Sequence, residues 1–157
     1  MTAMIDTPQI VQSPAQRVAS IRLKVPRAEI RQVMGPGIQE VMAAVAAQGI
    51  KPAGPWLTHH FQQPAEMFDF EICVPVPAPI TPTGRVQPGQ LRAAKVARTV
   101  YHGGYEGLGA AWGEFCVWIE TQGYKPAPDL WECYAKGPES GPDPTRWETQ
   151  LNQPLIG

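Results

Sequence analysis

An internal repeat is the feature of this sequence that most constrains its fold. Residues 48–53 (QGIKPA) recur 74 positions later as residues 122–127 (QGYKPA). The same shift, without gaps, aligns the apolar positions upstream of these segments and places residues 17–24 on residues 91–98. A constant shift over about forty positions indicates that the chain contains two copies of one supersecondary unit.

Each copy is expected to run strand, helix, strand, strand. In the first copy, residues 18–25 alternate apolar and polar side chains, as a half-buried strand does. Residues 36–48 then carry apolar side chains at helical spacing before Gly49, which favours a helix end. Residues 56–61 and 68–76 follow as two strands. The second copy repeats the plan, with strands at 91–101, 130–135 and about 146–153 and a helix at 105–122.

Two such units joined edge to edge predict an α+β fold, with one antiparallel sheet, both helices on one face and a pseudo-two-fold axis. We expect an N-terminal tail at residues 1–16 and a single domain at residues 17–157. In that domain, repeat one covers about 17–76 and repeat two about 91–155, and the proline-rich residues 77–90 form the crossover. Because clefts at internal interfaces commonly bind small molecules, a groove between the two helices is the expected ligand site.

Composition and charge exclude several classes of function. The 157 residues include 13 Lys and Arg and 14 Asp and Glu, which leaves no basic excess to hold a phosphate backbone. We therefore expect no direct nucleic-acid binding. No segment has the features of a signal peptide or of a membrane span, so we expect a cytoplasmic protein without membrane contact. The three cysteines and three histidines lack metal-ligand spacing, which predicts reduced thiols, no metal and no cofactor.

The strand at residues 130–135 carries the main candidate for a functional residue, Glu132. Strand alternation puts Leu130, Glu132 and Tyr134 on one face, and burying a carboxylate in so apolar a strand costs free energy. Thr58 stands at the equivalent position of repeat one, so the fold itself does not require an acid. Two interpretations stay open. Glu132 either lies in the groove, as a partner for a ligand cation or an acid–base group with a raised pKa, or faces solvent and pairs with a lysine or arginine.

Aromatic and imidazole side chains provide further candidates for ligand contact. Aromatic faces beside a carboxylate suit flat cations through stacking and cation–π contact. Tyr105 follows two glycines at a helix start and is expected to line the groove, whereas Trp112 also fits the apolar stripe of its helix and has a core role as its alternative. The candidate ligand-binding residues are Glu132, Tyr105, Trp112, Tyr134, Trp56, His60 and Tyr101.

Several segments, taken in order, resemble those of a known family. They are residues 68–76 (FDFEICVPV), 101–108 (YHGGYEGL), 131–134 (WECY) and 149–154, with Trp112 and Trp118 between them. Together they resemble the GyrI-like (gyrase-inhibitor-like) effector-binding domain, which also occurs in AraC-type and MerR-type multidrug regulators. The resemblance implies the duplicated fold and a multidrug-type pocket between the helices. In that pocket the glutamate that meets cationic ligands would be Glu132, and the family tyrosine after the glycine turn would be Tyr105.

The resemblance also orders the candidate functions. A stand-alone member of this family is expected to bind hydrophobic, aromatic and often cationic small molecules in the groove between the repeats. One alternative is a detoxifying hydrolase, because some stand-alone members resemble hydrolases that open cyclopropane rings of DNA-alkylating natural products. Glu132, Tyr105 and Tyr134 would then be catalytic. A second alternative is protein–protein inhibition of a topoisomerase. The sequence shows no DNA-binding segment, and a partner regulator stays unknown.

Overall fold

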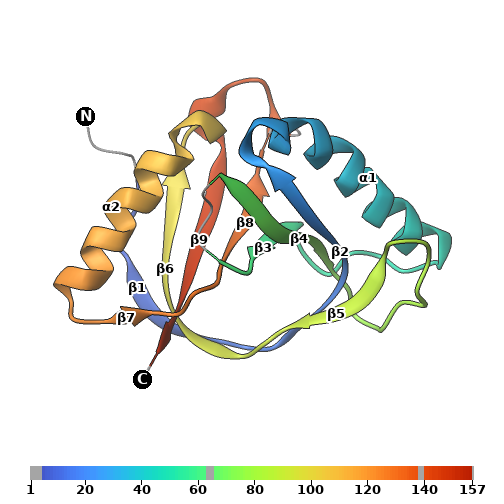
Figure 1. The fold of residues 1–157 in the computed structure, drawn as a ribbon, viewed down its shortest axis with the longest axis horizontal. Helices are drawn as coiled ribbons and strands as arrows, with labels where there is room; N and C mark the ends of the chain where they lie inside the picture. Colours follow the sequence, from blue (N-terminus) through green and yellow to red (C-terminus); the bar gives the residue numbers. More distant parts are fainter. Residues whose placement is uncertain (1–4, 63–65, 138–139, 157) are drawn as a thin grey trace. The chain divides into compact units, whose positions relative to one another are not determined.

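The computed structural model describes residues 5–62, 66–137 and 140–156, and the chain divides into two compact units (Figure 1). We call Pro14–Ala93 the repeat-one unit, and Met1–Ser13 with Ala94–Gly157 the repeat-two unit. Each unit combines antiparallel strands with one long helix, which confirms the α+β class.

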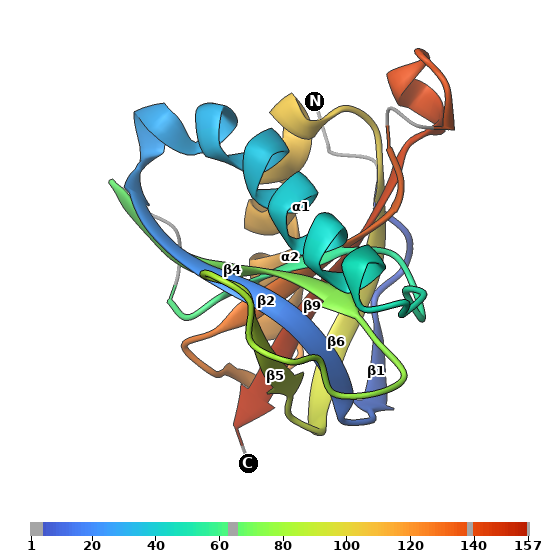
Figure 2. The same cartoon turned by 90° about the vertical axis from the view of Figure 1, so that its right-hand side faces the viewer.

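The repeat-one unit is a four-stranded antiparallel sheet covered on one face by a helix. Its core forms where Val41 and Val45 of the helix meet Ile21, Phe70 and Ile72 of the sheet, and Figure 2 shows the helix α1 running across β2 and β4. The strand order is β3-β4-β2-β5. The elements are β2 (Gln16–Pro26), a 3-10 turn (Arg27–Glu29), α1 (Ile30–Ala47), β3 (Leu57–His60), β4 (Met67–Pro75) and β5 (Gln87–Leu91).

The repeat-two unit has the same plan. Ala111, Phe115 and Ile119 of its helix pack on Ala97 and Leu151 of its sheet. The strand order is β8-β9-β6-β1, and a short strand β7 also pairs with β9. The elements are β1 (Gln9–Ser13), β6 (Ala94–His102), a 3-10 turn (Tyr105–Gly107), α2 (Leu108–Thr121), β7 (Lys125–Pro126), β8 (Leu130–Lys136), a 3-10 turn (Pro144–Arg146) and β9 (Glu148–Ile156).

Strand order supports the predicted duplication. The sheet order β3-β4-β2-β5 of the repeat-one unit matches, strand by strand, the order β8-β9-β6-β1 of the repeat-two unit. The strand-helix-strand-strand plan of each copy is therefore confirmed, and each unit gains one further edge strand.

No helix in the described residues is long and apolar enough to cross a membrane.

The edge strands depart from the sequence prediction. Residues 9–13, expected in an N-terminal tail, form β1 and pair with β6, and β5 occupies the end of the predicted crossover. In the chain, β1 immediately precedes β2 of the repeat-one unit, but it pairs with β6 of the repeat-two unit. Likewise, β5 immediately precedes β6 of the repeat-two unit, but it pairs with β2 of the repeat-one unit. Pro88 is tolerated in β5 because a strand at a sheet edge pairs on one side only.

The first helix also begins earlier than predicted. We expected it at residues 36–48, with Pro36 near its start, but α1 begins at Ile30 and contains Pro36. Proline inside a helix removes one backbone hydrogen bond, and here Pro36 lies on an exposed face. Apolar contacts of Ile30, Val33 and Met34 with the core stabilise the turns before it.

Candidate functional site

Glu132 lies on the face of the repeat-two sheet that is covered by α2. On β8 it pairs in register with Leu151 of β9, and Leu151 belongs to the core beneath the helix. The residue is 8% exposed, and it makes no ion pair in the part of the chain that the structure describes. The interpretation of Glu132 as a solvent-facing glutamate paired with a basic side chain is therefore wrong.

Two aromatic side chains hold the Glu132 carboxyl group, one at each oxygen. The indole Nε1 of Trp112, on α2, donates a hydrogen bond to Oε2 at 2.6 Å. The hydroxyl of Tyr134, two residues along β8, donates to Oε1 at 2.5 Å. Helical spacing and strand alternation thus bring three predicted site residues together, and Trp112 also keeps its core contact, with its ring 5.6 Å from that of Phe115.

Burial dominates the protonation chemistry of this cluster. Removal from water raises the pKa of Glu132, while the hydrogen bonds from Tyr134 and Trp112 oppose that rise by stabilising the charged form. The net pKa is raised, so this carboxyl group takes up a proton more readily than an exposed glutamate. A cation brought next to it would favour the carboxylate and lower the pKa again.

Tyr105 and Trp147 extend the aromatic surface outward from Glu132. The Tyr105 ring meets the Tyr134 ring edge to face, with centroids 5.8 Å apart, and the Trp147 ring lies 5.2 Å from Tyr105. Both residues are half-buried. Trp147 was not among the predicted site residues, because the sequence places it inside a strand that in fact begins at Glu148. Its indole nitrogen donates to the Gly141 carbonyl at 3.0 Å, which fixes the ring against the preceding loop.

Tyr101 positions the turn that carries Tyr105. Its side chain is buried, and its hydroxyl donates to the Gly104 carbonyl at 2.8 Å. A Cβ atom at Gly103 or at Gly107 would lie within 2.6 Å of that hydroxyl, so the turn needs glycine on both sides of it. Direct ligand contact by Tyr101 stays a prediction.

The remaining two candidates belong to the repeat-one unit. Trp56 is half-buried and packs against the core beneath α1. His60 is 6% exposed and stacks on Phe70 with centroids 5.2 Å apart. That these two residues contribute to one groove together with Glu132 stays a prediction.

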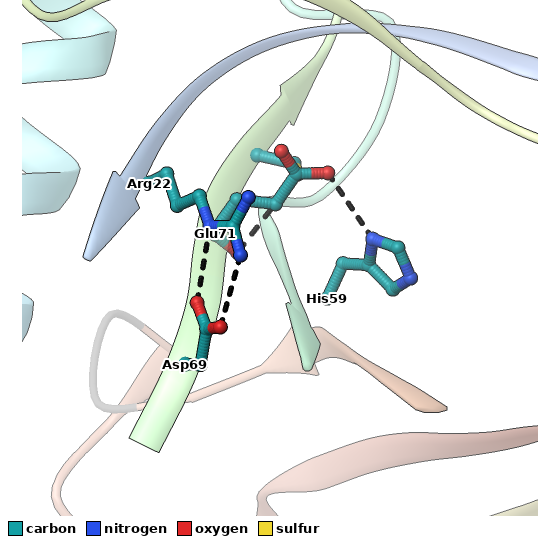
Figure 3. A network of polar contacts seen from close by, with 5 residues as sticks. Arg22, His59, Asp69 and Glu71 are labelled. Carbon is teal, nitrogen blue, oxygen red and sulfur yellow. Dashed lines mark hydrogen bonds and ion pairs between the residues drawn. The ribbon is translucent and has the colours of Figure 1, made fainter. Parts of the chain in front are cut away.

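The opposite face of the repeat-one sheet carries a network in which opposite charges are paired (Figure 3). Arg22 donates two hydrogen bonds to the Asp69 carboxylate, at 3.0 and 2.9 Å, and this holds the pKa of Asp69 below its ordinary value. On the neighbouring strand, His59 lies 3.1 Å from Glu71. These carboxylates have basic partners, and in this they differ from Glu132, which makes no ion pair in the described residues.

Metal and thiol chemistry have no support in the described residues. They contain no group of three His, Cys, Asp or Glu side chains that would hold a metal ion. The three cysteines are free thiols, and burial raises the pKa of Cys133 to about 11, which disfavours the reactive thiolate.

Comparison with known proteins gives one family and a set of similar folds. The model of the GyrI-like small molecule binding domain matches residues 6–155. Among curated proteins no sequence match was found. The crystal structure of the EcmrR C-terminal domain is 23% identical, with a TM-score of 0.83, and the match covers 96% of this chain and 97% of that one. In the EcmrR–DNA complex, the match covers 95% of this chain but 57% of the EcmrR chain.

Two more distant structures share the fold. SAV2435 bound to tetraphenylphosphonium is 13% identical, with a TM-score of 0.65, and the match covers 97% of this chain and 95% of that one. A hydrolase from Listeria innocua is 14% identical, with a TM-score of 0.66, and the match covers 95% and 91% of the two chains. At these identities the likeness shows the fold alone.

Proposed function

This chain belongs to the GyrI-like family of small-molecule-binding domains, and we propose that it binds hydrophobic, aromatic cations through Glu132. The observation that carries the proposal is a buried carboxyl group whose hydrogen-bond partners are two neutral aromatic donors.

Burying the Glu132 carboxylate costs free energy. An ionised carboxylate removed from water loses several kcal/mol of hydration, which two hydrogen bonds offset only in part. Within the described residues no basic side chain forms an ion pair with Glu132. A ligand cation would therefore supply the missing counter-charge, and binding would favour the ionised form.

The surroundings of Glu132 suit the rest of such a ligand. Trp112, Tyr134, Tyr105 and Trp147 offer aromatic faces that attract both apolar surface and positive charge. Since Glu132 itself is closed off in this structure, we expect a ligand to enter by displacing the half-buried rings of Tyr105 and Trp147. Tetraphenylphosphonium, bound by the structurally similar SAV2435, is a cation of this class.

Glu132→Gln tests the proposal with two ligands on one frame, the cation diphenylmethylammonium and neutral diphenylmethanol. Gln keeps the shape, accepts from Trp112 and donates to Tyr134, so the variant should fold. Affinity for the cation should fall about 5- to 150-fold, equivalent to roughly 1–3 kcal/mol, while affinity for the alcohol stays unchanged in calorimetric titration.

The matched control is Glu120→Gln, which removes an exposed carboxylate from α2 of the same unit and should change neither affinity. Equal losses of the cation and of the alcohol in Glu132→Gln would show that the carboxyl group shapes the site without acting as a charge partner.

Hydrolysis is the second candidate function, favoured by the 2.5 Å contact between the Tyr134 hydroxyl and Glu132. A carboxyl group with a raised pKa beside a phenol is suited to accept a proton from an attacking water and to return it to a leaving group. Incubation with an electrophilic cyclopropane, followed by product analysis, separates the two functions. Multiple turnovers to a ring-opened product that fall at least about 10²-fold in Glu132→Gln would establish catalysis. Unchanged compound bound one to one would establish binding.

A further inference from the structure

One ring nitrogen of His60, in the repeat-one unit, is buried and lacks a hydrogen-bond partner in the part of the chain that the structure describes. The ring stacks on Phe70 and meets Phe68 edge to face, with centroids 5.2 and 5.8 Å apart. Its Nε2 lies 3.2 Å from the Thr58 hydroxyl. Its Nδ1 is buried and has no hydrogen-bond partner among the residues that the structure describes.

Such an atom is unusual, because buried polar groups in proteins are nearly always hydrogen-bonded. Burial also lowers the pKa of His60 to about 4, with a smaller contribution from His59, so the ring is neutral at physiological pH. A neutral imidazole has one N–H and one lone pair. Nδ1 therefore offers one hydrogen bond to a polar group, as donor or acceptor according to the tautomer.

The surroundings of His60 are apolar and only partly closed. His60, on β3, pairs in register with Phe70 of β4. Phe68, also on β4, pairs with Val25 of β2. Above this end of the sheet lie Ile30, Val33 and Met34 of α1, and these side chains, with Val25 and Phe68, are only partly buried. The same end of the unit thus combines incompletely covered apolar surface with an unused hydrogen-bonding atom.

A hollow in the surface adjoins this region. It measures about 570 Å³ and is lined by Pro26, Arg27, Ala28 and Glu66. The Arg27 guanidinium lies over the Phe68 ring, 5.6 Å from its centroid. Arg27 thus borders the hollow and also covers the Phe68 ring, so a small molecule in the hollow would reach Phe68 and His60 by displacing the Arg27 side chain.

The duplication relates His60 to the site of the other repeat. The 74-residue shift places Thr58 on Glu132 and His60 on Tyr134. In the repeat-one unit Thr58 contacts His60, two residues along the same strand. In the repeat-two unit Glu132 contacts Tyr134 in the same way. One copy thus carries an acid with a phenol, and the other carries a hydroxyl with a neutral imidazole.

We propose that His60 forms a second binding site, within the repeat-one unit, that takes a neutral aromatic group carrying one hydrogen-bonding atom. The group belongs to an uncharged molecule that the repeat-one unit binds by itself. The proposal goes beyond the charge-based function of Glu132 and does not depend on it.

The test compares diphenylmethanol, whose hydroxyl both donates and accepts, with diphenylmethane, which does neither. The wild-type chain should bind the alcohol more tightly, and His60→Phe should lower the alcohol affinity about five- to tenfold while leaving diphenylmethane unchanged. Phe keeps the stacked ring and removes both nitrogens, including the Nε2 that contacts Thr58, so the ligand-free variant should be no less stable than Thr58→Val, which loses the same contact.

His59→Gln is the matched control, because His59 neighbours His60 but lies on the opposite face of the sheet, and it should leave both affinities unchanged. Thr58→Val removes the Nε2 contact and should weaken alcohol binding in part, while Val preserves the β-branched shape. The proposal is overturned if wild type does not prefer the alcohol, or if His60→Phe keeps that preference. An unfolding temperature for His60→Phe well below that of Thr58→Val, which loses the same Nε2 contact, would overturn it as well, since Nδ1 would then be used in the free protein.

The Glu132 proposal is tested by the Glu132→Gln variant and the His60 proposal by the His60→Phe variant, so the two proposals fail independently.

Discussion

At position 132 a carboxyl group occupies the place that a hydroxyl occupies at the equivalent position 58. Both side chains lie on strands beneath a helix, in register with core residues Leu151 and Ile72. The backbone therefore accepts either group, and the acid at position 132 is not needed for the fold. What the acid adds is a buried, titratable charge without a basic partner in the described residues.

Tyr134→Phe should change the titration of Glu132 in a defined direction. The phenol stabilises the ionised carboxylate, so its removal raises further a pKa that burial has already raised. At a fixed pH more of the protein then carries a protonated Glu132, and affinity for tetraphenylphosphonium falls about three- to tenfold. Because that ligand's charge does not vary with pH, the pH at which its affinity is half-maximal reports on Glu132 and should move upward.

Tyr124→Phe removes the same atom from a half-buried tyrosine of the same unit and should leave that pH midpoint in place. An unshifted midpoint in Tyr134→Phe would mean that the 2.5 Å contact does not govern ionisation of Glu132.

Sequence periodicity was sufficient to predict that Glu132 and Tyr134 share a face and that this face lies beneath a helix. Alternation placed Glu132 and Tyr134 together, and helical spacing placed Trp112 above the sheet, where it both packs in the core and donates to Glu132. The ring contact between Tyr105 and Trp147 was not predictable. It depends on where the loop before β9 ends, and loop geometry leaves little periodic signal.

At the scale of elements, α1 lies very close to its sheet at Gly37. A Cβ atom there would lie 2.6 Å from the Ile72 Cδ1 atom, whereas Ala111 occupies the equivalent, fully buried position of α2. A Cβ atom is therefore accommodated at this position of α2, but the equivalent position of α1 has no space for one. The early start of α1 is a second difference that the sequence did not reveal, because Pro36 is typical of a first helical turn and only tertiary contacts stabilise the turns before it.

Gly37→Ala should destabilise the protein by about 1–3 kcal/mol, because overpacking against Ile72 outweighs the gain in helix propensity. Adding Ile72→Val removes the clashing Cδ1 atom and should recover part of the loss, which denaturant unfolding of the two variants measures. Gly35→Ala is the control in the same helix, where a Cβ meets nothing within 4 Å, and it should stabilise by about 0.5–1 kcal/mol. Equal effects at the two glycines would contradict a close approach at Gly37.

At the scale of the whole molecule, the duplication is complete only when the edge strands are counted. Each repeat was predicted as three strands and a helix, but each unit has a fourth strand at its edge, β1 paired with β6 and β5 paired with β2. Neither edge strand was predicted, because each pairs on one side only and one contains a proline. A short strand that pairs on one side only needs little alternation of apolar and polar residues in its own sequence.

Deletion of residues 1–13 should therefore destabilise the chain, although this segment was expected to be a tail. The deletion removes the pairing of β1 with β6, the bond from the Thr99 hydroxyl to the Asp6 carbonyl and the Arg98 contact with Ser13. We expect a loss of at least about 2 kcal/mol in the free energy of unfolding, since each hydrogen bond contributes about 0.5–1.5 kcal/mol. Deletion of residues 1–4 alone leaves β1 intact and should have little effect. Equal stability of both truncated chains would show that β1 pairing does not contribute.

The titration of the Glu132 carboxyl carbon, followed by NMR with and without saturating tetraphenylphosphonium, tests the central claim most directly. If Glu132 is the charge partner of a bound cation, its pKa in the free protein lies above that of an ordinary glutamate and moves down when the cation binds. A pKa that stays the same in the saturated complex would contradict the account, because a cation bound elsewhere leaves this carboxyl group buried and unpaired.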